Sequence, residues 1–168
     1  CWITELDGQT EDFNYTRLMI DFYKSVRVNG GSLDIVGKKA DFNGYKLIIV
    51  PSFVNLETDT FKKMVSSGAK ILAGPRTGIK NSNFQIPENL SLEGLGYKVK
   101  RVNALPYELP IEVEWKGQKG KLHVWREQGD SSGVSEGKSE DDFPVITSGN
   151  QGSYLCGWPD EALLSSIM

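Results

Sequence analysis

Two short polar segments combine residue types that could bind an anion. Pro51-Ser52-Phe53 and Pro75-Arg76-Thr77-Gly78 each follow a short apolar run, and Lys80 comes two residues later. Turn amides beside a guanidinium and an ammonium group could bind a phosphate, including that of a flavin. However, no Gly-x-Gly-x-x-Gly follows an apolar run and no Gly-x-x-x-x-Gly-Lys-Ser/Thr occurs. The pattern therefore favours a structural or interface loop, with an anion or cofactor site as the alternative.

Nucleophilic catalysis is the second chemistry to consider. A cysteine enzyme needs its thiol on a sharp strand-to-helix turn, within reach of a histidine base. Cys156 instead lies inside the apolar run 155–158, and the single histidine, His123, alternates with Leu122 and Val124. We expect a buried structural thiol at Cys156 and a partly exposed strand residue at His123. One histidine, and only two cysteines at opposite ends of the sequence, Cys1 and Cys156, also indicate no metal site.

Paired carboxylates are the third chemistry, because glycoside hydrolysis uses two acids at a fixed separation. Glu112 and Glu114 would share one face of a strand, about 7 Å apart. A solvated strand face explains the pair better than a sugar site. The tryptophans are expected in the core, although exposed coplanar rings would indicate a carbohydrate-binding module. They are Trp2, Trp115, Trp125 and Trp158.

The elements that must position these residues alternate between strand and helix in the first half of the chain. Apolar runs between turn residues predict strands, and amphipathic segments predict helices. Thr10, followed by two acids, is expected to cap the first helix. The expected order is strand 1–6, helix 10–29, strand 32–36, strand 46–50, helix 57–67 and strand 70–74. This alternation predicts an α/β domain with a mostly parallel sheet and helices on both faces, carrying its functional loops at the strand ends.

The second half has period-two alternation and predicts an antiparallel extension of that sheet. Residues 116–120 form a candidate hairpin loop. Residues 127–142 hold six acids, three glycines and four serines, and are expected to form a solvated loop, with an acidic binding surface as the alternative. The expected strands are 97–102, 111–115, 121–125, 143–147 and 153–158, followed by a helix from Pro159.

Composition sets the outer bounds on function. The chain has 168 residues, 39% hydrophobic and 24% charged, with a formal charge of -3, as expected for a single globular domain. Near-balanced charge predicts no nucleic-acid partner, and the lack of a long apolar run predicts no membrane span. The chain starts on an apolar segment without methionine, so we expect a fragment of a larger multidomain protein. A cytoplasmic location is favoured, with periplasmic or secreted locations open.

Several segments carry a resemblance to a known family. Residues 41–51 read Asp-Phe-Asn-Gly-Tyr-Lys-Leu-Ile-Ile-Val-Pro. They are similar to Asp-Leu-Ser-Gly-Tyr-Lys-Leu-Val-Val-Ala-Pro of the middle, trimerisation domain of glycoside hydrolase family 42 β-galactosidases. Residues 74–81 resemble the family's Thr-Pro-Arg-Thr-Gly-Val-Lys-Asp. Further similar segments lie at 61–68, 93–106 and 143–157, in the order that the family has them.

The resemblance implies a flavodoxin-like or class I glutamine amidotransferase-like domain that lacks that fold's catalysis and needs no cofactor. It implies that two catalytic glutamates of a retaining mechanism lie on a separate barrel domain, and that this domain joins subunits into a homotrimer. The strand-end loops would then contact the chain's own or a neighbouring barrel. The interface candidates are Phe53, Asn55, Arg76, Thr77, Gly78, Lys80 and Asn81.

A non-catalytic oligomerisation domain is therefore the leading hypothesis from the sequence. The main alternative is an amidotransferase-like enzyme or a flavin- or ligand-binding module that uses the strand-end loops. An accessible Cys156 beside His123 would favour the enzyme, whereas a buried thiol would oppose it.

Overall fold

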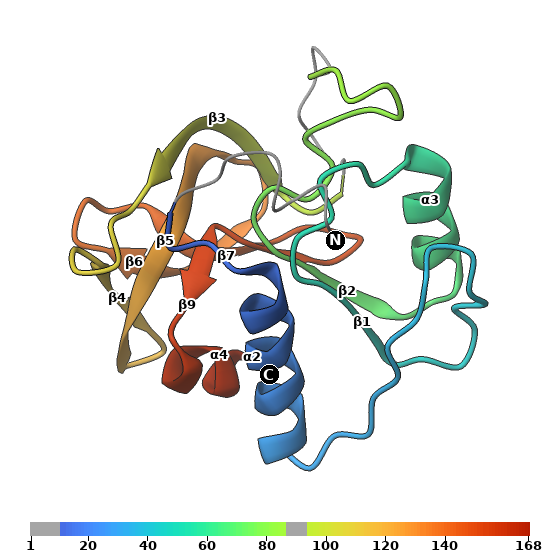
Figure 1. The fold of residues 1–168 in the computed structure, drawn as a ribbon, viewed down its shortest axis with the longest axis horizontal. Coiled ribbons are helices and arrows are strands. Elements are labelled where there is room, and N and C mark those ends of the chain that lie inside the picture. Colours follow the sequence, from blue (N-terminus) through green and yellow to red (C-terminus); the bar gives the residue numbers. More distant parts are fainter. Residues whose placement is uncertain (1–10, 87–93) are drawn as a thin grey trace.

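The computed structural model describes residues 11–86 and 94–168, which form three helices and one nine-stranded sheet (Figure 1). The helices are α2 (Tyr15–Val28), α3 (Thr58–Ser66) and α4 (Glu161–Ile167). The strands are β1 (Leu47–Val50), β2 (Lys70–Ala73), β3 (Tyr97–Ala104), β4 (Ile111–Trp115), β5 (Gln118–Ser131), β6 (Val134–Ser139), β7 (Pro144–Ser148), β8 (Ser153–Leu155) and β9 (Gly157–Pro159). Among these described elements, no helix is both long and apolar enough to span a bilayer.

The sheet is mixed and mainly antiparallel. Its order is β1-β2-β8-β7-β6-β4-β5-β3, with β9 paired to β5. Within the described residues, only β1–β2 and β2–β8 are parallel pairs, while the six other pairings are antiparallel. The prediction of a mostly parallel, flavodoxin-like or amidotransferase-like sheet with helices on both faces is therefore wrong. The antiparallel strands are the larger part of the sheet, not an extension of a parallel core.

The long strand β5 explains much of this difference. It extends to Ser131, into the segment 127–142 that was expected to be a solvated loop, and β6 occupies residues 134–139 of the same segment. Arg126, Glu127 and Gln128 are all buried, and both carboxylate oxygens of Asp141 accept hydrogen bonds from Arg126 Nη1 at 2.7 Å. Polar side chains that satisfy one another can be buried in a sheet. The polar composition of this segment was therefore a misleading signal for a loop.

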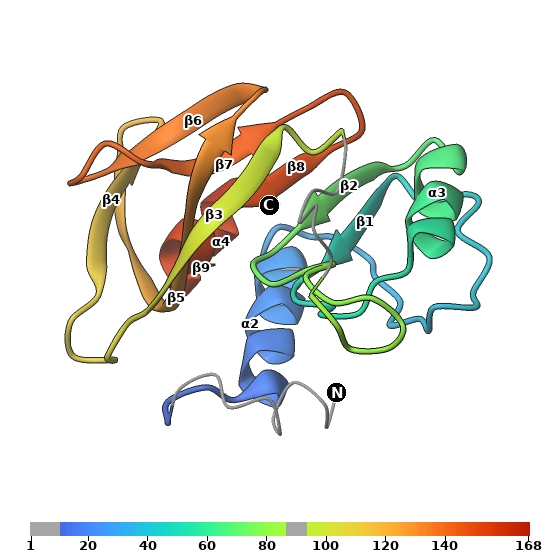
Figure 2. The ribbon, with the colours of Figure 1, turned by 90° about the horizontal axis from the view of Figure 1, so that it is seen from above.

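The second half of the chain closes around its own core. Cys156 lies between β8 and β9, where its N–H donates to Val145 O at 2.9 Å and its carbonyl accepts from Glu127 N at 2.7 Å. One residue thus links β7 to β5, and the strands curve around an enclosed apolar cluster (Figure 2). Leu163 of α4 packs into that cluster and is fully buried. The cluster consists of Leu105, Val113, Leu122, Val145 and Leu163.

Two clusters lie on the two faces of β2. Ile71 and Ala73 pack with Phe61 of α3 in one cluster, whereas Leu72 packs with Phe22 of α2 in the other. The alternation of β2 side chains between faces produces this arrangement. The expectations for β1, α3 and β2 are confirmed to within one residue at each end.

Two local expectations are wrong. Residues 32–36 form no strand, and Ile35 and Val36 are 74% and 45% exposed. The hairpin loop before β5 is only two residues long, because Lys116 and Gly117 both have positive φ (50° and 81°), as a tight type I′ turn requires. The expected strand 1–6 lies outside the described residues.

Helix α2 begins later than expected. Asn14, not Thr10, is its N-cap, and Asn14 Oδ1 accepts from Arg17 N at 2.8 Å. Residue 10 lies outside the described residues. Asn14→Ala should remove this bond and lower the free energy of unfolding by about 1 kcal/mol. Urea unfolding followed by circular dichroism measures the change, and Asn14→Asp, which keeps the acceptor, should stay near wild type. Equal losses in both variants would contradict a capping role.

Candidate functional site

The loops after β1 and β2 are fastened to each other by backbone hydrogen bonds. Gly74 N donates to Val50 O at 2.8 Å, and Gly78 N donates to Phe53 O at 2.9 Å. Lys80 N donates to Val54 O at 2.9 Å. These bonds make residues 51–54 and 74–80 one ordered surface at the end of the parallel strands. The same bonds engage amides that a phosphate would need, so this turn is poorly suited to an anion.

Thr77 and Arg76 support this surface from the interior of the domain. Thr77 Oγ1 accepts from Phe53 N at 3.2 Å and donates to Val50 O at 3.4 Å, and the residue is buried. Arg76 is also buried and has φ 64°, which non-glycine residues seldom adopt. Its guanidinium carbon lies 4.6 Å from the centre of the Trp125 ring, a cation–π distance. Both residues therefore position the loops from within the chain.

Glu127 is a buried hydrogen-bond acceptor for the Arg76 backbone. It is fully buried, and its Oε1 accepts from Arg76 N at 3.1 Å and from Trp125 Nε1 at 3.2 Å. Its Oε2 accepts from the Tyr154 hydroxyl, and its backbone carbonyl accepts from Tyr97 Oη at 3.1 Å. Burial raises the pKa of the carboxyl, although these hydrogen bonds and the Arg76 charge oppose the shift. Sequence reasoning missed Glu127 because residues 125–128 are all buried, so no alternation marks them.

The expected interface candidates divide by exposure. Phe53, Asn55, Gly78 and Lys80 are half-buried, and Asn81 is exposed. Beyond them, Asn81 Oδ1 accepts from Asn83 N at 2.9 Å and Gln85 N at 3.0 Å, which folds residues 81–86 into a tight loop. We call residues 81–86 the contact loop. It projects from the domain after β2 (Figure 1) and exposes two apolar side chains, Phe84 (42%) and Ile86 (71%).

Cys156 and His123 do not form a catalytic pair. Cys156 is fully buried, its Sγ lies 4.0 Å from Tyr154 O, and burial raises the pKa of the thiol. A nucleophilic cysteine needs the opposite, an accessible thiol with a lowered pKa. His123 instead stacks on Tyr107 at 5.3 Å, and burial lowers the pKa of the imidazole. The expectation of a buried structural thiol is confirmed.

Glu112 and Glu114 are exposed on β4, as expected. Glu112 lies opposite Lys121 on β5, and Glu114 lies opposite Lys119. Opposite charges across a strand pair stabilise a sheet surface, which accounts for both carboxylates. Trp125 and Trp158 are buried in the core, as expected, and do not form an exposed sugar platform. Trp115 is half-buried, and Trp2 lies outside the described residues. Among the described residues, no group of three or more potential metal ligands occurs.

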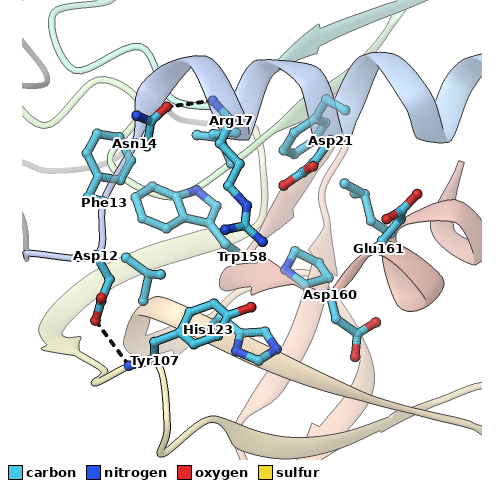
Figure 3. Close-up of a pocket in the computed structure, with 15 residues that line it drawn as sticks. Asp12, Phe13, Asn14, Arg17, Asp21, Tyr107, His123, Trp158, Asp160 and Glu161 are labelled. Atoms are coloured by element: carbon cyan, nitrogen blue, oxygen red, sulfur yellow. Dashed lines mark hydrogen bonds between the residues drawn. The ribbon is translucent and has the colours of Figure 1, made fainter.

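A small pocket lies between the first turns of α2, β5 and the start of α4 (Figure 3). Its volume is about 300 Å³, at the lower limit for small-molecule sites. The aromatic rings around it cover each other: Tyr107 stacks on His123, and Phe13 stacks on Trp158 at 4.9 Å. The guanidinium of Arg17 lies 5.8 Å from the Tyr107 ring centre. The pocket shares no residue with the interface candidates.

Comparison with known proteins places this geometry in a family. The family model described as the β-galactosidase trimerisation domain matches residues 1–153. The chain belongs to this trimerisation domain family. The domain is 30% identical over 171 residues to the β-galactosidase BgaA of a Thermus species and 29% identical to a β-galactosidase of Thermus thermophilus. Each match covers 99% of this chain and 26% of the relative.

Solved structures agree with the family assignment. A crystal structure of β-galactosidase from the psychrophilic Marinomonas ef1 superposes on the domain with a TM-score of 0.91 and 31% identity. It covers 99% of this chain and 26% of that protein. The β-galactosidase of the Antarctic haloarchaeon Halorubrum lacusprofundi has a TM-score of 0.89 at 24% identity and the same 99% coverage, which supports the fold alone. The trimerisation domain thus corresponds to about a quarter of these enzymes.

Proposed function

We propose that this domain joins the subunits of a family 42 β-galactosidase into a homotrimer and performs no chemistry itself. The match to the trimerisation domain over residues 1–153 carries the proposal. In this proposal the parent enzyme hydrolyses terminal β-galactosides with two glutamates on its barrel domain. The full burial of Cys156 supports a non-catalytic role and leaves the amidotransferase-like alternative without support.

The contact loop and the candidate residues beside it form the proposed interface with a neighbouring subunit or barrel. Phe84 and Ile86 are exposed apolar side chains on a projecting loop, the kind of anchor that interfaces bury. Asn81 shapes this loop, while Phe53, Asn55, Gly78 and Lys80 flank it. Arg76 and Thr77 are buried within the chain, so they hold the loop while the exposed residues make the contact. A closed three-fold ring requires such a patch to meet a different surface on the next subunit.

A double substitution tests the interface in the full-length enzyme. Phe84→Ser with Ile86→Ser should remove about 2 kcal/mol of association free energy, a weakening of about 30-fold. Sedimentation velocity over a concentration series should show trimers dissociating at higher protein concentration than in wild type. Val28→Ser is the matched control, because Val28 is 74% exposed at the end of α2 and lies outside the contact loop.

Three results would each overturn a different part of the proposal. Unchanged trimers in the double variant would remove the contact loop from the interface. A wild-type enzyme that stays monomeric at all concentrations would remove the oligomerisation function itself. Hydrolysis of a nitrophenyl galactoside by the isolated domain, surviving Glu112→Gln with Glu114→Gln, would contradict the non-catalytic assignment.

A further inference from the structure

A bulge in β5 brings two consecutive side chains to the small pocket between α2, β5 and α4. Successive residues of a regular strand point to opposite faces of the sheet, yet His123 and Val124 both line this pocket. The pairing of β5 with β9 shifts register between His123 and Arg126, and Val124 has φ 65°. A β-branched residue seldom adopts a positive φ, so the backbone is strained here. Bulges and strained residues are common beside binding sites.

Two ring nitrogens in the pocket wall have no hydrogen-bond partner among the described residues. They are Trp158 Nε1 and His123 Nδ1, and both atoms are buried. The whole Trp158 residue is only 5% exposed. A buried polar group without a partner costs stability, so native proteins keep few of them. Burial lowers the pKa of the His123 imidazole, so at pH 7 the ring is neutral, with one donor and one acceptor nitrogen.

Charged groups of both signs also line the pocket. Arg17 reaches into it from α2, between the rings of Trp158 and Tyr107 (Figure 3). Within the described residues, its guanidinium makes no ion pair. Burial raises the pKa of the Asp21 carboxyl, the Arg17 charge lowers it, and the Glu161 charge raises it. These three groups therefore act on one another around the pocket.

This set of groups discriminates between classes of ligand. An anion would be repelled by the carboxylates of Asp21 and Glu161, and a cation would be repelled by Arg17. A hydroxyl group carries one donor and two acceptor sites, so it can bond to groups of both kinds. The aromatic walls already stack in pairs, Phe13 on Trp158 and Tyr107 on His123. Hydrogen bonds, not ring stacking, must therefore hold the ligand.

We propose that this pocket binds a neutral polyhydroxylated compound of about the size of one hexose. Arg17 and Trp158 Nε1 donate to its oxygens, and Asp21 and Glu161 accept from its hydroxyl groups. Arg17 is exposed, so its long side chain can adjust around the ligand and open the way to the buried nitrogens. The volume of about 300 Å³ suits a single sugar ring better than an oligosaccharide. The pocket is separate from the contact loop, so this binding does not depend on the proposed trimer.

Nuclear magnetic resonance of the 168-residue chain tests the site without any substitution. Titration with D-galactose or D-glucose to about 50 mM should shift the indole N–H resonance of Trp158, because this proton gains an acceptor. A small ligand held by a few hydrogen bonds is expected to bind in the millimolar range. Inorganic phosphate and tetramethylammonium chloride are the charged probes, and neither should shift this resonance. No shift with either sugar, or an equal shift with a charged probe, overturns the proposal.

Arg17→Gln tests the role of the guanidinium group. It should weaken sugar binding about 10-fold or more, since hydrogen bonds from charged donors are among the stronger ones. The helix cap is kept, because Asn14 accepts from the backbone N of residue 17. Arg27→Gln is the matched control: it removes the same charge from the last turn of α2, outside the pocket, and should bind sugar like wild type. Equal weakening in both variants overturns the site, because it indicates a general effect of charge.

Discussion

Replacing Glu127 by alanine is expected to lower the free energy of unfolding by about 3–4 kcal/mol. The substitution leaves Arg76 N, Trp125 Nε1 and the Tyr154 hydroxyl without their acceptor in a buried site. Each unsatisfied buried donor costs about 1–3 kcal/mol, and the costs are not fully additive. In a domain of this size the melting temperature should fall by about 10 °C.

Glu127→Gln is the matched control, because it keeps the side-chain shape and one acceptor oxygen. It should lose only about 1 kcal/mol, since the amide can still accept from Arg76 N and Trp125 Nε1. Differential scanning calorimetry and urea unfolding of wild type and the two variants measure both effects. Equal losses for the alanine and glutamine variants would contradict the acceptor role and indicate a packing effect alone.

The same pair of proteins gives a pH test. Burial raises the pKa of the Glu127 carboxyl above the value of about 4.3 in the unfolded chain. The folded state therefore binds the proton more tightly than the unfolded state. The stability that the raised pKa of Glu127 contributes is fully present below about pH 4.3 and is lost as the pH rises through the pKa of the folded state. Wild type should lose stability relative to Glu127→Gln over this rise, and a pH-independent difference would contradict the raised pKa.

The sequence predicted the elements whose apolar runs are short and bounded by turn residues. β1, α3, β2 and β4 match their expected ranges closely, because glycine, proline or polar residues end each run. Family membership was also predicted from the order of segments such as 41–51 and 74–81. Neither signal describes how strands pair.

The fold class failed for that reason. Alternating strands and helices in the first half predicted a parallel sheet, but most pairings in the described residues come from hairpins and long antiparallel strands in the second half. Because residues 127–142 are polar, the sequence did not predict β6 or the end of β5. Buried Arg126 and Glu127 are tolerated there because residues outside β5, Asp141 and Arg76, hydrogen-bond to them. Such partners are tertiary contacts, which a single sequence does not show.

Gly129 is a second example of a tertiary contact that the sequence does not show. A Cβ at this position would lie 2.0 Å from Lys98 O on β3, so only glycine allows the close approach of β5 to its neighbour. In the sequence, this glycine looked like one more loop residue among the polar ones. The sequence also predicted that the loops of the candidate site follow β1 and β2. It did not predict that Glu127, on a distant strand, supports them.

Gly74 provides the second large expected effect, because it directly follows β2 and begins the segment 74–80 that leads to the contact loop. A Cβ on Gly74 would lie 2.0 Å from Pro51 O and 2.9 Å from Pro51 C, both backbone atoms that no rotamer change can move. Gly74→Ala should therefore cost about 3 kcal/mol or more, because the two loop backbones must separate. Thermal unfolding measures this loss.

Gly37→Ala is the matched control for Gly74→Ala. A Cβ at Gly37 meets no atom within 4 Å, and its φ lies outside the positive range. The stability of Gly37→Ala should stay within about 0.5 kcal/mol of wild type or rise slightly, because alanine restricts the unfolded chain.

Separation of the loops in Gly74→Ala would also break the bond from Gly74 N to Val50 O and shift residues 74–80. If the contact loop joins subunits as proposed, this variant should weaken trimers even at temperatures where it remains folded. A folded Gly74→Ala protein with wild-type assembly would show that the interface does not depend on the strand-end loops.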